Sequence, residues 1–172
     1  MKTLRAVVAV AMLVLALTLQ VSVMPHLSIA GVVPNLCLLV VVGAALTRGP
    51  GFGMMLGLVA GLMIDLAPPA DHVAGRWALA LVVVGYLAGR MRPETRLGAW
   101  AVVVAVAGCS FVGTSVFALS GVVLRDPAIG VVDMLTVIAV SVGYDVLLTP
   151  LVLPVVLAVL TRLEPERERV AA

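Results

Sequence analysis

The sequence contains few charged residues. Only 12% of its 172 residues are Asp, Glu, Lys or Arg, whereas 63% are hydrophobic, and the mean hydropathy is +1.23. A water-soluble domain of this length needs more polar surface than these residues supply. The composition therefore argues against a soluble globular protein and predicts a protein embedded in a membrane.

Cysteines and catalytic motifs are also scarce. Cys37 and Cys109 lie in apolar stretches without Cys-x-x-Cys spacing, which favours buried free thiols over a disulfide. The sequence has no Gly-x-Ser-x-Gly elbow, His-Glu-x-x-His motif or phosphate-binding loop. The residues with metal-binding side chains match no ligand motif: His26, Asp65, Asp71 and His72. We therefore expect no enzymatic activity, no metal, no cofactor and no nucleic-acid partner.

Long apolar runs fill the chain and are separated by short turns. A helix that bonds its own backbone crosses the hydrocarbon core in about 20 residues. We predict an all-α, polytopic transmembrane bundle of about six helices that forms one integral membrane domain, residues 1–172. The predicted spans are 5–24, 33–47, 51–67, 73–91, 98–124 and 131–162. The first run exceeds the apolar region of an ordinary signal peptide, so we favour an uncleaved helix.

The basic residues alternate between the two sides of this predicted bundle. Nine of the eleven lie at the termini or in the second and fourth connections: Lys2, Arg5, Arg48, Arg90, Arg92, Arg96, Arg162, Arg167 and Arg169. The positive-inside rule then places both termini in the cytoplasm, with the helices in an inner membrane. If the second and third spans formed a re-entrant hairpin instead, the basic residues of the other connections would still alternate between the same two sides. The hairpin would also bury Arg48 near mid-membrane at a cost of about 2.5–3.5 kcal/mol, so full spans are favoured.

Glycines recur at four-residue spacing in two neighbouring spans. Gly53, Gly57 and Gly61 share one face of the third span, and Gly85 and Gly89 repeat the spacing in the fourth. Small residues let helix backbones approach closely in lipid, where no hydrophobic force drives association. This spacing indicates close helix contact. Packing within the chain is favoured, and a homo-oligomer seam is the alternative.

The last span contains an acid and two prolines. Asp145 lies deep in an apolar run, where a carboxylate must be paired, solvated or protonated. It is either a structural lock beside Tyr144, Ser141 or Thr149, an ion, proton or substrate site, or a contact for a partner helix. Pro150 and Pro154 each remove a backbone donor, which predicts that the helix bends or opens there.

A second acid, Asp65, lies at the predicted end of the third span. A carboxylate at a helix C-terminus is on the unfavourable side of that helix's dipole. Some other group must therefore compensate its charge. Arg76, at the start of the fourth span, is the nearest candidate in the sequence.

Several motifs resemble the rod shape-determining protein MreD family, over almost the whole chain. They are Leu19-Gln20, Pro34-Asn35-Leu36, Gly57-x-x-x-Gly61-Leu62-x-x-Asp65-Leu66, Gly85-Tyr86-x-x-Gly89-Arg90 and Tyr144-Asp145-x-x-x-Thr149-Pro150-x-x-x-Pro154. The chain departs from the family pattern at two positions. The family more often has Asp where this chain has Asn35, and Asn where it has Asp145.

The resemblance implies a non-enzymatic scaffold of the bacterial elongation machinery. It would bind the bitopic protein MreC and, indirectly, MreB, RodA and a penicillin-binding transpeptidase during lateral peptidoglycan synthesis. The expected fold is similar to the substrate-binding subunits of energy-coupling-factor transporters. A vitamin-type transporter subunit is therefore the alternative function, although 4% aromatic residues are few for such a pocket. The candidate partner-binding or structural residues are Gly57, Gly61, Asp65, Tyr144, Asp145, Pro150 and Pro154.

Overall fold

The computed structural model describes residues 2–29, 31–68, 73–92, 98–124 and 131–162. Within these ranges the chain forms six α-helices and a 3-10 turn: α1 (Lys2–Ser22), η1 (Met24–Leu27), α2 (Leu36–Arg48), α3 (Pro50–Leu66), α4 (Arg76–Arg90), α5 (Ala99–Val123) and α6 (Val131–Arg162). Each helix lies within three residues of its predicted bounds. The all-helical bundle that the hydropathy pattern predicts is therefore confirmed.

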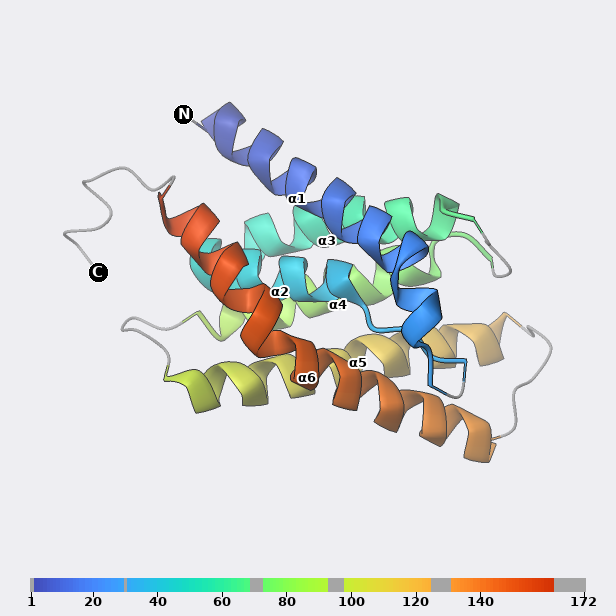
Figure 1. Cartoon of the computed structure of the whole chain (residues 1–172). Helices are drawn as coiled ribbons and strands as arrows, with labels where there is room; N and C mark the ends of the chain where they lie inside the picture. Colours follow the sequence, from blue (N-terminus) through green and yellow to red (C-terminus); the bar gives the residue numbers. More distant parts are fainter. Residues whose placement is uncertain (1, 30, 69–72, 93–97, 125–130, 163–172) are drawn as a thin grey trace.

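Successive helices run back and forth through the bundle, so that the connections alternate between its two ends (Figure 1). At one end, an Arg48 guanidinium nitrogen lies 3.4 Å from the carbonyl oxygen of Leu160, near the end of α6. Arg48 begins the tight α2–α3 turn, in which Gly49 has a φ of 83° that favours glycine. The hairpin therefore reaches the end of the bundle, as the position of Arg48 predicts.

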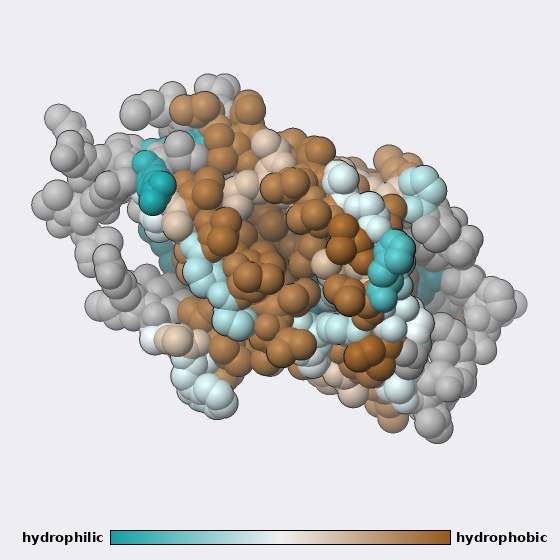
Figure 2. Space-filling view, viewed as in Figure 1, coloured by the Kyte–Doolittle hydropathy of each residue, from teal (hydrophilic) through white to brown (hydrophobic). Residues whose placement is uncertain are grey.

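The outer surface of the bundle is apolar. Large hydrophobic side chains are exposed along α1, α3, α5 and α6. On the face in Figure 2, hydrophobic residues cover most of the middle and the most hydrophilic ones lie toward the two ends. Three of the described helices are long and apolar enough to cross a membrane: Leu4–Ser22, Ala99–Val123 and Met134–Arg162.

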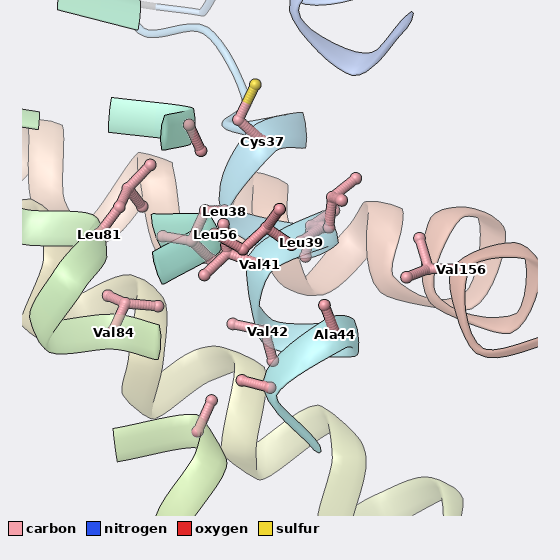
Figure 3. Packing of buried hydrophobic residues seen from close by; sticks show 14 of the residues in the cluster. Cys37, Leu38, Leu39, Val41, Val42, Ala44, Leu56, Leu81, Val84 and Val156 are labelled. Carbon is pink, nitrogen blue, oxygen red and sulfur yellow. The ribbon is translucent and has the colours of Figure 1, made fainter. Parts of the chain in front are cut away.

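The short helix α2 forms the centre of the bundle. It has 13 residues, and every residue from Leu36 to Leu46 is buried. Figure 3 shows its side chains in one cluster with Leu56 of α3, Leu81 and Val84 of α4 and Val156 of α6. A helix that is apolar on all sides is stable only when other helices surround it. Because α2 is enclosed by protein, it does not have to match the thickness of a bilayer.

The glycine faces of α3 and α4 pack directly against each other. A Cβ at Gly53 would lie 2.4 Å from the carbonyl oxygen of Gly85, and a Cβ at Gly57 would lie 2.2 Å from that of Leu81. A Cβ at Gly61 would lie 2.3 Å from the Cα of Ala78. The prediction of close packing within the chain is confirmed. This face is consequently not available as a seam between two copies.

Candidate functional site

The carboxylate of Asp145 lies where α2, α5 and α6 meet. Asp145 is 1% exposed. One carboxylate oxygen accepts from the backbone N–H of Asn35 at 3.0 Å, and the other accepts from the Ser110 hydroxyl at 2.6 Å. The Asp145 side chain therefore joins α6 to the preceding helix α5 and to the start of α2, which lies 110 residues earlier in the sequence.

These contacts cap the N-terminus of α2. The first backbone N–H groups of a helix have no partner within the helix. The side-chain oxygen of Asn35 accepts from the N–H of Leu38 at 2.9 Å, as an N-cap residue does. The Gln20 side chain of α1 accepts from the N–H of Cys37 at 3.2 Å. Acceptors from α1 and α6 thus complete a helix start that is buried inside the bundle.

The expected neighbours of Asp145 bond to other groups. The Thr149 hydroxyl donates to the backbone carbonyl of Asp145 at 2.7 Å, and the Tyr144 hydroxyl donates to the backbone carbonyl of Leu27. Neither of these two hydroxyls donates to the Asp145 carboxylate. Tyr144, the residue before Asp145 in α6, instead binds the connection between α1 and α2.

Asp65 caps a different helix in the same manner. It is 2% exposed and accepts from the N–H groups of Gly75, Trp77 and Ala78 at 2.8, 3.1 and 3.1 Å. These three amides form the start of α4. Asp65 is at the unfavourable end of α3 but at the favourable, positive end of α4. The backbone of the next helix therefore supplies compensation for the carboxylate.

Arg76, the counter-charge candidate, is bound to α5. Its guanidinium donates to the Ser120 hydroxyl at 3.3 Å and to the carbonyl oxygen of Phe117 at 3.0 Å, and it lies 4.1 Å from the centroid of the Phe117 ring. Phe117 also contacts Trp77, whose ring stacks on it with centroids 4.4 Å apart. Arg76 is only 7% exposed, so it ties α4 to α5 from within the bundle.

Gly121 provides the space for this guanidinium, since a Cβ there would lie 2.2 Å from an Arg76 nitrogen. We expect Gly121→Ala to displace the guanidinium and to lower the free energy of unfolding by about 1–2 kcal/mol. Denaturant titration in detergent micelles measures this loss. Gly108→Ala, on the same helix but with no atom within 4 Å of its Cβ, is the control. Equal stability of the two variants would contradict the assignment.

The two prolines bend α6 without opening it. The helix is continuous from Val131 to Arg162 with Pro150 and Pro154 inside, and it changes direction along its length (Figure 1). The predicted bend is therefore present. Both prolines are exposed on the surface of the bundle.

The metal candidates do not come together in the part of the chain that the structure describes. No group of three His, Cys, Asp or Glu residues there is arranged to hold a metal ion. Asp71 and His72 lie outside the described residues. Asp65 already accepts three backbone hydrogen bonds.

Comparison with protein families identifies the chain. The family of rod shape-determining protein MreD matches residues 1–162. The chain belongs to the MreD family. Comparison with curated proteins and with solved structures gives no match, so the likeness to energy-coupling-factor subunits stays a prediction.

The two positions at which this chain departs from the expected MreD pattern are in contact, since the Asp145 carboxylate accepts from the backbone N–H of Asn35. The resemblance predicts Asp and Asn at these positions, and the chain has Asn35 and Asp145. This chain therefore has one carboxylate and one carboxamide at the start of α2. The sequence motifs indicated both residues separately but gave no sign of their contact.

Proposed function

We propose that this MreD family protein is a non-enzymatic scaffold in the bacterial inner membrane that binds an MreC-like bitopic protein. Through that partner it would act with MreB, RodA and a penicillin-binding transpeptidase in lateral peptidoglycan synthesis. The match to the MreD family over residues 1–162 carries this proposal, because the family determines rod shape.

The charges support an orientation with both termini in the cytoplasm. Arg48 contacts the end of α6 near Arg162, and Gly89, at the end of α4, packs on Pro50. Arg48, Arg90 and Arg162 therefore share one end of the bundle. In an inner membrane such an end faces the cytoplasm.

The exposed face of α6 is the candidate docking surface for the partner's transmembrane helix. Gly143, Leu147, Leu151 and Val155 are exposed there, beside the two prolines. A proline donates no backbone hydrogen bond, so the carbonyl four residues before each proline loses its usual donor. In hydrocarbon such backbone groups are stable when other protein covers them. The glycine face of α3, by contrast, is occupied by α4.

Co-purification of an MreC-like protein expressed with this chain tests the proposal. We expect the partner to stay bound through affinity purification from native membranes. Leu151→Trp, which adds bulk at a residue 70% exposed on α6, should lower the recovered partner about tenfold, a loss of about 1.4 kcal/mol in binding.

Met55→Trp is the matched control, since Met55 is 73% exposed on α3. It should leave recovery of the partner unchanged. Failure of the unmodified chain to retain an MreC-like protein would overturn the scaffold function. Equal loss in both variants would instead exclude α6 as the specific docking face.

A further inference from the structure

The start of α2 lies at mid-depth in the bundle. The 13 residues of α2 extend about 20 Å at 1.5 Å per residue, beginning from the end of the bundle that carries Arg48. Its N-terminus stops short of the far ends of α5 and α6 (Figure 1). The hydrocarbon core of a bilayer is about 30 Å thick, so the contact between Asn35 and Asp145 belongs to its interior.

The geometry around Asp145 suits an ionised carboxylate. Each of its oxygens accepts one hydrogen bond, and the 2.6 Å separation from the Ser110 hydroxyl is typical of a charged acceptor. The N-terminus of α2 adds about half a positive charge from its backbone dipoles. Both hydrogen-bond donors are neutral groups, and Asp145 forms no ion pair with any described residue. Dipoles therefore balance the negative charge.

The NH2 group of the Asn35 carboxamide has no acceptor among the described residues. Asn35 is 7% exposed, and its oxygen is fixed on the N–H of Leu38. Its Nδ2 atom is buried, and no acceptor among the described residues bonds it. A buried donor without an acceptor is destabilising. The Asp145 carboxylate, which bonds the backbone N–H of the same Asn35, has unused lone pairs, so one water molecule can accept from Nδ2 and donate to the carboxylate.

We propose that positions 35 and 145 form one composite site that holds a single negative charge and a water molecule at the N-terminus of α2. The site fixes the part of α6 before its prolines to α2 and α5. Its requirement is one carboxylate and one carboxamide, and either position can supply either group. With Asp at 35, one oxygen still caps Leu38, and the other takes the place of Nδ2, where the same water can donate to it and accept from the carboxamide at 145.

A double-mutant cycle tests this interchange. The proteins are the unmodified chain, Asn35→Asp, Asp145→Asn and the double variant Asn35→Asp/Asp145→Asn, each purified in detergent. Asn35→Asp places two carboxylates together, and one must take up a proton. Asp145→Asn leaves two carboxamides and no charge. We expect each single variant to lower the midpoint of thermal unfolding by about 4–8 °C, and the double variant to recover most of that loss.

Infrared spectroscopy provides a second readout, the protonation state of the carboxyl groups. A loss of packing alone would not change it. We expect the unmodified chain and the double variant to show an ionised carboxylate for this site, and Asn35→Asp to gain a protonated carboxyl band. Additive losses of stability in the double variant, or a protonated Asp145 in the unmodified chain, would overturn the proposal.

Two further outcomes are decisive. Single variants that do not fold support the proposal if the double variant folds, and a double variant that also fails to fold overturns it.

A density map that resolves ordered water should show one water molecule bonded to both side chains. A map without this water would overturn the water-bridged form of the site. None of these measurements uses an MreC-like partner, so their results are independent of the proposed scaffold function.

Discussion

Replacing Gly57 by valine is expected to separate α3 from α4 and to lower the free energy of unfolding by about 3 kcal/mol or more. A Cβ at this position would lie 2.2 Å from the carbonyl oxygen and 2.7 Å from the carbonyl carbon of Leu81. Both are backbone atoms, so no side chain can rotate away, and the two helices must move apart. Gly53 and Gly61 depend on the same close approach, and their contacts would be lost together. Denaturant titration in micelles measures the effect.

Gly108→Val is the control for this prediction. Gly108 also lies inside a helix, but no atom lies within 4 Å of its added Cβ. Valine has a higher helix propensity than glycine, so this variant should be at least as stable as the unmodified chain. If Gly57→Val were as stable as Gly108→Val, the α3–α4 packing would be wrong.

The helices could be predicted closely from the sequence because hydropathy and turn residues mark their ends. The α2–α3 turn is an example, since Gly49 and Pro50 leave little freedom for its position. The four-residue glycine spacing also predicted close packing. It did not identify which residues of α4 the α3 glycines contact. The spacing marks the face of one helix and not the residues that pack against that face.

The central position of α2 was not predicted. Its signal was present, since eleven consecutive residues from Leu36 to Leu46 are apolar or glycine and all are buried. In a membrane protein, however, lipid and protein are both apolar surroundings. An apolar helix can therefore face either, and hydropathy alone does not distinguish an enclosed helix from an outer one.

The hydrogen bonds of the two buried acids depend on tertiary structure in the same way. Asn35 and Asp145 are 110 residues apart in the sequence. For Asp65 the sequence indicated that its charge needed compensation, and the nearest opposite charge was Arg76. Three of its donors are backbone amides, which nearly every residue carries, so no side-chain pattern reveals them. In both cases a carboxylate closes the N-terminus of a neighbouring helix.

Replacing Asp65 by alanine is the second change with a large expected effect. The variant leaves the N–H groups of Gly75, Trp77 and Ala78 without their carboxylate acceptor at the start of α4. We expect a loss of about 2–4 kcal/mol in the free energy of unfolding, because a buried donor without a partner costs about 1–3 kcal/mol. Thermal unfolding in detergent should show a lower midpoint, by about 4–16 °C.

Asp65→Asn separates the hydrogen bonds from the charge. Its single oxygen can still accept from one or two of the three amides, whereas its NH2 group faces the others as a second donor. Its midpoint should therefore fall between those of the alanine variant and the unmodified chain. Met55→Ala, at a residue 73% exposed on the same helix, controls for truncation and should change the midpoint little. An alanine variant at position 65 as stable as this control would show that the carboxylate does not hold the start of α4.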